Sequence, residues 1–352
     1  MPIEVTIDDA REFAANVFKK LAVPADIADD IAAHLVESDR VGYASHGLSI
    51  LPRYRHALAE GQVTFDGRPE RVVDHGALIG YDGHNGFGQH VGKVVIEDAI
   101  ARTQQRGQCI VTLRNSHHLG RMGHYGEMVA ERGFVLLAFT NVTNRSPTVA
   151  PFGGTEARLT TNPLCFAGPL PGGRPPFVVD IATSAIAVNK ARVLAENGLP
   201  APPGSLVDAD GHPTSDAGAL FTDPPGALLP FGGHKGYALG LTAELLAGIL
   251  SGGGTIQPNN PRHGAATNNL FGVVLDPQVD FNQTWRSHEV ESFLEYLLSC
   301  PPQDPANRVQ YPGEYEAANR ARHEKTIDLP ESVRKPFADL AAELGVAPLV
   351  PA

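Results

Sequence analysis

The residues best suited to chemistry form a histidine-rich stretch at 115–126 (NSHHLGRMGHYG), which contains three of the fourteen histidines. A β-rich run at 108–113 precedes it and helical spacing begins at Met122, so the pattern predicts strand, polar turn and helix. His117 and His118 then lie between a strand end and a helix N-terminus, where irregular backbone presents polar groups to a ligand. The positive helix end lowers a histidine pKa, and a neutral imidazole near pH 7 suits a general base. Loop histidines without a function are the plainer alternative.

Two further groups could take part in proton transfer. Ser45 and His46 lie in a Ser-His-Gly turn between two helical patterns, but adjacent residues rarely form a nucleophilic dyad and the chain has no G-x-S-x-G sequence. Asp180 lies in an apolar strand, where an unpaired carboxylate is costly, so we expect it to have a partner. A histidine would suit, because the carboxylate orients the ring and stabilises its protonated form. A cap on the following helix is the alternative.

The signals for phosphate and metal binding are weak. Lys235 follows Gly-Gly-His and opens a helical pattern, so its ammonium group and the nearby backbone N–H groups could hold a phosphate. The three cysteines are far apart with no CxxC, and no H-E-x-x-H occurs, so we predict no metal site. A sparse, odd set of cysteines is typical of a reducing compartment.

Composition narrows the class of partner. The chain has 352 residues and a formal net charge of −11, which argues against nucleic acid and anionic membranes as partners. A small anionic substrate needs only local positive charge. The N-terminus shows no signal-peptide pattern, and the most apolar helical segment, 237–250, is short and contains Glu244. We therefore expect a soluble, cytoplasmic protein.

The elements that must position these residues follow from periodicity. Helical spacing occurs at 7–21, after Pro24 and again near both 290–297 and 337–344, whereas the middle of the chain is strand-rich. Glycines at 83, 86 and 88 follow one predicted strand, but they run G-x-x-G-x-G and no suitably spaced acidic residue follows. The sequence therefore argues against a Rossmann dinucleotide-binding unit.

Six motifs in one order resemble the type-2 malate/L-lactate dehydrogenase family over nearly the whole chain. They are 42–47 (GYASHG), 115–120 (NSHHLG), 161–163 (TNP), 180–184 (DIATS), 234–239 (HKGYAL) and 312–314 (PGE). The segments 51–54 (LPRY) and 120–123 (GRMG) are most similar to the hydroxycarboxylate dehydrogenase B branch.

The resemblance implies a cytoplasmic, homodimeric oxidoreductase that transfers a hydride between NAD(H) and a 2-hydroxy acid/2-oxo acid pair. It implies a mixed α/β fold with a largely antiparallel sheet in a non-Rossmann NAD(P)-binding domain. We place that domain at 69–284, with an irregular excursion at about 198–230, and a discontinuous helical domain at 1–68 plus 285–352. NAD is expected from the branch resemblance, and NADP is the alternative.

The resemblance also assigns residues. His118 matches the proton acceptor of the family, and Ser45, His46 and Asp180 match a relay assigned in a branch that reduces cyclic imino acids. Matching positions for the cofactor are His46, Gly120, Arg121, Met122, Val178, Val179, Asp180, Ile181, Ala182, His234, Lys235, Asn268, Glu314, Tyr315, Glu316 and Ala317.

This chain departs from the family pattern at the substrate. Several members place a carboxylate-binding arginine where this chain has Ile50. We expect Arg53, Tyr54 and Asn162 to contact the substrate, with Arg53, Arg121 or a residue of a partner subunit holding the acid. Two alternatives stay open: an NADPH-dependent reductase of cyclic imino acids, and an inactive dimeric binding module.

Overall fold

The computed structural model describes residues 3–262, 264–278 and 282–352. Its centre is a seven-stranded sheet with strand order β2-β3-β4-β11-β5-β6-β7, in which β3 and β4 run parallel and the other described neighbours antiparallel. The strands are β2 (Glu70–Asp74), β3 (Leu78–Asp82), β4 (Gln108–His117), β5 (Val135–Thr143), β6 (Leu164–Gly168), β7 (Phe177–Ile181) and β11 (Thr267–Leu275). The expected largely antiparallel sheet is confirmed.

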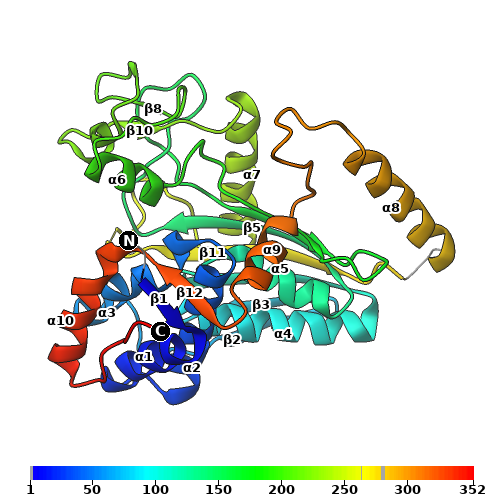
Figure 1. Cartoon of the computed structure of the whole chain (residues 1–352), viewed down its shortest axis with the longest axis horizontal. Coiled ribbons are helices and arrows are strands. Elements are labelled where there is room, and N and C mark those ends of the chain that lie inside the picture. Colours follow the sequence, from blue (N-terminus) through cyan, green and yellow to red (C-terminus); the bar gives the residue numbers. More distant parts are fainter. Residues whose placement is uncertain (1–2, 263, 279–281) are drawn as a thin grey trace.

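Helices cover both faces of this sheet (Figure 1). On one face, α4 (Gly88–Arg106) and α5 (Met122–Glu131) bury their apolar sides against the sheet in one core. On the other face lies α7 (His234–Leu250), which contacts β5 and β11. Burial of both sheet faces explains why β5 reads as a nearly continuous apolar run.

The two chain ends build a second lobe together. β1 (Ile3–Thr6) pairs with β12 (Thr326–Leu329), and the backbone N–H of Ala352 donates to the Glu4 carbonyl at 2.9 Å. Helices from both ends share one apolar core: α1 (Ile7–Lys20), α2 (Ala25–Arg40), α3 (Leu51–Ala59) and α10 (Arg334–Leu344), joined by the single turns η1 (Ala44–His46), η2 (Leu48–Ile50) and η4 (Glu331–Val333). The discontinuous lobe at 1–68 plus 285–352 stays a prediction as a domain boundary.

Several elements differ from the sequence-based expectation. The excursion at 198–230 contains a small sheet above α6 (Val188–Glu196), made of β8 (Leu206–Val207), β9 (Pro213–Thr214) and β10 (Ala227–Leu228), with η3 (Ala217–Phe221). The segment after Pro312, which reads as a turn, begins α9 (Glu314–Arg322). Finally, α8 (Gln283–Leu298) projects to one side, outside the terminal core, with Leu294 as its buried residue (Figure 1).

Candidate active site

One cavity of about 640 Å³ lies where the sheet, the terminal lobe and α6 meet. All four residues predicted to be catalytic line it: Ser45, His46, His118 and Asp180. They come from η1, from the turn between β4 and α5, and from β7, so the fold brings together positions more than 130 residues apart in the chain. A concave pocket with convergent polar groups is the expected form of a small-molecule site.

His118 is held by a buried tyrosine and a buried glutamine. The Tyr54 hydroxyl lies 2.7 Å from His118 Nδ1, and Gln89 Nε2 donates to the same hydroxyl oxygen at 2.8 Å. A phenol oxygen has one proton and two lone pairs, so it can donate to Nδ1 or accept from an Nδ1–H group. Tyr54 therefore fixes the ring through Nδ1. When Nδ1 carries the hydrogen and the Tyr54 oxygen accepts it, Nε2 is unprotonated and can act as a base.

Burial favours the neutral form of both His118 and His46. Burial lowers the pKa of His118 well below its usual 6.5, and His46, His117, Arg53 and Arg145 add to this. Burial, followed by Arg121 and Arg53, lowers the pKa of His46 to about 4. Sequence analysis predicts the direction for His118 but attributes it to the helix end, whereas desolvation is the largest cause in the structure.

The Ser45, His46 and Asp180 set is only partly connected. Ser45 Oγ lies 3.0 Å from His46 Nδ1. Asp180 Oδ2 accepts from the backbone N–H of Gly123 at 2.6 Å, and among the described hydrogen bonds none joins it to a histidine. The structure therefore corrects the expectation that Asp180 has a histidine partner. Its carboxylate instead caps a helix, and this helix is α5 rather than the helix that follows Asp180 in the sequence. Burial raises the pKa of Asp180 to about 6.

Five further residues that we predict to contact the cofactor line the cavity: Gly120, Arg121, Met122, Ala182 and Asn268. Arg121 donates through Nη2 to Glu127, but its Nε and Nη1 are buried without a hydrogen-bond partner. Gly120 has φ +78°, and a Cβ there would lie 2.5 Å from His34 Nε2. Unpartnered guanidinium atoms in a cavity need an oxygen acceptor, so these residues fit a dinucleotide.

Other predicted site residues lie outside the lining of this cavity. These are Asn162, Val178, Val179, Ile181, His234, Lys235, Glu314, Tyr315, Glu316 and Ala317. Glu316 is linked to it indirectly, because it accepts from the hydroxyl of Tyr43, which lines the cavity. His234 and Lys235 are exposed at the start of α7.

Asn162 has a structural environment. Its buried side-chain amide donates to Glu244 Oε2 at 2.7 Å and to the Gly240 carbonyl at 3.0 Å, while its oxygen accepts from Thr160. These bonds join the segment before β6 to α7 and leave little capacity for a substrate. We therefore withdraw Asn162 as a substrate ligand.

Sequence reasoning did not single out several polar residues of the cavity, among them Tyr43, Arg145, Asn189 and Arg192. Asn189 bridges the lobes, since it donates to the Ser45 carbonyl at 3.2 Å and accepts from Arg53 at 3.4 Å. Tyr43 belongs to the motif at 42–47, whereas Arg145, Asn189 and Arg192 lie outside the six motifs and nothing local in the sequence marks them.

The buried carboxylate of Asp39 positions the Ser-His-Gly turn through a hydrogen bond to the residue that follows it, Leu48. Its Oδ2 accepts from the Leu48 N–H at 2.7 Å, whereas Oδ1 is buried without a partner. A side chain at Gly47 would lie 2.1 Å from that oxygen, so only glycine fits the turn. Burial raises the pKa of Asp39 from 3.8 to about 8.

This raised pKa predicts a pH-dependent stability. The folded state binds a proton that the unfolded state releases, so the contribution is fully present below pH 4 and is lost as pH rises through 8, by up to about 1.4 kcal/mol per pH unit. Asp39→Asn keeps the bond to Leu48 and should flatten this dependence in urea unfolding at pH 5 and pH 8. An identical loss in wild type and variant would contradict the assignment.

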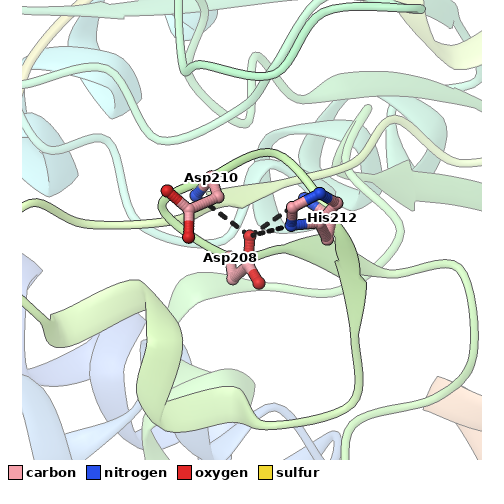
Figure 2. A group of neighbouring side chains, drawn as sticks. All are labelled: Asp208, Asp210 and His212. Atoms are coloured by element: carbon pink, nitrogen blue, oxygen red, sulfur yellow. Dashed lines mark hydrogen bonds and ion pairs between the residues drawn. The ribbon is translucent and has the colours of Figure 1, made fainter.

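A separate group of possible metal ligands lies on the excursion. Figure 2 shows Asp208, Asp210 and His212, whose ligand atoms lie within 4.8 Å of one another on the surface. Asp208 Oδ1 already accepts from the backbone N–H groups of Asp210 and His212, at 3.0 and 2.9 Å. This is the geometry of a loop closed by an aspartate, and we base no metal site on it.

The comparison with known proteins decides the family. The model of the malate/L-lactate dehydrogenase family matches residues 5–337. The chain belongs to the malate/L-lactate dehydrogenase family. The L-lactate dehydrogenase of Cupriavidus necator is 64% identical and covers 98% of this chain and 99% of its own length. Hydroxycarboxylate dehydrogenase B of Escherichia coli strain K12 is 34% identical over 95% of this chain and 92% of its own length.

Comparison with a solved structure supports the same family. A chain from Escherichia coli, provisionally described as a malate/lactate dehydrogenase, superimposes with a TM-score of 0.93 at 32% identity, over 98% of this chain and 96% of that one. The expected family, the mixed α/β fold and the activity of a hydroxy-acid dehydrogenase acting on a CH–OH donor are thereby confirmed. Dehydrogenases of this family imply a nicotinamide cofactor. Among the described residues of this family member, no helix combines the length and the apolar character needed to cross a membrane.

Proposed function

We propose that this dehydrogenase interconverts a 2-hydroxy acid and a 2-oxo acid with NAD(H), using His118 as the proton carrier. The observation that carries the proposal is the ring of His118: it lines the cavity, is neutral through burial, and is fixed at Nδ1 by Tyr54. The relatives named above act on lactate and on hydroxycarboxylates, which supports the substrate class.

The chemistry follows from this geometry. The nicotinamide, when bound, accepts a hydride from the substrate carbon or returns it. In the oxidation, His118 Nε2 removes the hydroxyl proton, while Nδ1–H donates to the Tyr54 oxygen and stabilises the imidazolium. In the reduction, the protonated ring returns that proton to the developing alkoxide. The cofactor would be held by Arg121, which lines the cavity and whose Nε and Nη1 have no hydrogen-bond partner among the described residues, together with Gly120, Met122, Ala182 and Asn268.

The 1-carboxylate of the substrate requires a cation that Ile50 does not supply. Arg53 is the replacement we propose, because it lines the same cavity one helical turn further along and lies beside Tyr54. A guanidinium group can bind a carboxylate through two parallel hydrogen bonds, which orients it as well as holding it.

The test of the proposal is a substrate panel measured with NADH and NADPH in separate assays. We expect NADH oxidation with 2-oxo acids, with kcat/KM at least tenfold higher than with NADPH. A strong preference for cyclic imino acids with NADPH would select the alternative reductase, which the 3.0 Å contact of Ser45 with His46 favours. Absence of turnover together with no binding of either dinucleotide by calorimetry would favour an inactive binding module.

We further propose a cytoplasmic homodimer. Leu241, Leu245 and Ile249 repeat every four residues along α7 and are 38 to 58% exposed, which makes an apolar stripe on one helix face. Contiguous exposed apolar surface of this kind marks interaction sites in soluble proteins.

Leu245→Asp tests this dimer. A charge buried in an apolar contact is costly, so the variant should sediment as a monomer at a concentration where wild type is a dimer. Leu199→Asp, at a residue that is 53% exposed outside α7, is the matched control and should stay dimeric. If both variants sediment as dimers, the dimer interface does not lie on this face of α7.

A further inference from the structure

The strand that leads to His118 contains an irregularity. β4 and β11 pair antiparallel, and their register shifts so that one residue of β11, Asn269, lies opposite two of β4, Arg114 and Asn115. This arrangement is a β-bulge. Asn115 has φ +55°, in the left-handed region where asparagine is enriched among the residues other than glycine. A bulge changes the direction in which a strand continues, so this one sets the approach of the chain to His118.

The side chain of Asn269 holds the bulge. Its Oδ1 accepts from the backbone N–H of Asn115 at 3.0 Å, which gives the inserted residue a hydrogen-bond partner. The neighbouring Asn268 acts further along the turn, where its Oδ1 accepts from the N–H of Leu119 at 2.8 Å. The two amide oxygens therefore anchor the chain on both sides of His118.

Both amides are held by one residue of β5, Asn141. Its side-chain oxygen accepts from Asn269 Nδ2 at 2.9 Å, and its backbone carbonyl accepts from Asn268 Nδ2 at 3.1 Å. Asn141 Nδ2 donates in turn to Glu244 Oε1 on α7 at 3.2 Å and to the Gly254 carbonyl at 3.0 Å. The three asparagines and the glutamate are all buried, so the chain of hydrogen bonds runs through the interior from α7 to the turn.

Glu244 fixes the direction of these hydrogen bonds. A carboxylate only accepts. Its described donors are all neutral N–H groups, from Asn141, Asn162 and Ile256. Asn141 must therefore turn its NH2 group to Glu244 and its oxygen to Asn269. The oxygen of Asn269 is then left for the N–H group of Asn115.

We infer that Asn269 is a positioning residue for His118. Its amide holds the β4 bulge, and with it the turn that carries the ring, in the orientation that Glu244 imposes through Asn141. These three residues lie outside the set that lines the cavity, so they act on the substrate through the position of His118. This inference rests on the proposed function and adds to it the group that places the proton carrier.

Asn269→Leu tests the inference, because leucine has a similar volume and makes neither hydrogen bond. A misplacement of about 1 Å in a catalytic group can cost about a hundredfold in rate, so kcat for 2-oxo acid reduction should fall by about ten- to a hundredfold. The KM for NADH should change less than about threefold, because Asn269 does not touch the dinucleotide in our assignment. Asn269→Asp keeps the oxygen that accepts from Asn115 and should keep more of the rate.

Two further variants extend the test. Glu244→Gln places an NH2 group against N–H donors at nearly constant shape, and it should lower kcat in the same direction as Asn269→Leu. Thr103→Val is the matched control. It removes a buried hydroxyl that donates to the carbonyls of Ala99 and Val274, near the other end of β11, and it should leave kcat unchanged.

A double-variant cycle separates positioning from a general loss of structure. In the His118→Ala background, Asn269→Leu should have no further effect on kcat, since the group that it positions is already gone. A fall by the same factor in both backgrounds, or an unchanged kcat in Asn269→Leu alone, would overturn the inference. Where Asn269→Leu does not fold, Glu244→Gln takes its place in the cycle under the same criteria.

If His118→Ala itself keeps the wild-type rate, the proposed function fails, and hydrogen exchange then decides the anchoring role separately. The backbone amides of residues 115–119 should exchange faster in Asn269→Leu than in wild type, and at the wild-type rate in Thr103→Val. Equal exchange of this segment in wild type and Asn269→Leu would reject the anchor.

Discussion

His118→Ala should reduce kcat for 2-oxo acid reduction by about a thousandfold, within the 10²–10⁴ range that a positioned general acid contributes. The reason is geometric: Tyr54 fixes His118 at 2.7 Å through Nδ1, and none of the hydrogen bonds of the described residues involves the other ring nitrogen. Removal of the ring takes away the proton donor without removing a group that we assign to the dinucleotide. The affinity for NADH, measured by fluorescence titration, should therefore change little.

Two comparisons make this result specific. His212→Ala, at an exposed histidine on the excursion, should keep the wild-type rate. His46→Ala should lower kcat less than His118→Ala does, because Ser45 and His46 are not linked to Asp180 by a hydrogen bond. If the His46 variant were the more damaged of the two, the relay through Ser45 would be the proton path.

Arg121→Met should lower the free energy of unfolding by about 3 kcal/mol. The Arg121 and Glu127 side chains are 1% and 7% exposed, so the substitution leaves a buried carboxylate without one of its two cations. Arg320 still lies 3.0 Å from Glu127, which is why we expect the lower end of the 3–5 kcal/mol range for a broken buried pair. Urea unfolding measures the change.

The control is Arg158→Met, which removes an exposed pair with Glu156 and should change stability by less than about 1 kcal/mol. The double variant Arg121→Met with Glu127→Leu should regain part of the loss, because no buried charge is then left uncompensated. Equal losses in Arg121→Met and Arg158→Met would show that burial of this pair contributes little.

Sequence could predict the elements whose residues carry a local pattern. Helices α1, α2, α4 and α10, and strands β4 and β5, follow from periodicity and glycine positions. β1 and β12 could not be found this way, since each has four residues and is stabilised by pairing across the whole chain. The helical spacing near 290–297 belongs to α8 (Gln283–Leu298), but the position of this helix outside the terminal core depends on tertiary contacts.

The residues of the site also fall into two groups, those that a local motif marks and those that only the fold brings together. His118 and His46 could be singled out because their motifs are contiguous, and both line the cavity. Arg145 and Arg192 also line the cavity but could not be singled out, because no local motif surrounds them and only the fold brings them to it. For Asp180, the cost of burying a carboxylate predicts that it has a hydrogen-bond partner but does not predict which one. In the structure the partner is a backbone N–H group of α5, not a histidine.

The most direct test of the account is the pH dependence of kcat/KM in both directions. The pKa of His118 is well below 6.5, so at neutral pH the ring is mostly unprotonated. Reduction needs the proton, and its kcat/KM should fall about tenfold per pH unit as pH rises from 6 to 9, whereas oxidation should be nearly constant there. In His118→Gln this slope should disappear along with most of the rate. A reduction rate that is independent of pH in wild type, or the same slope in the variant, would contradict His118 as the proton carrier.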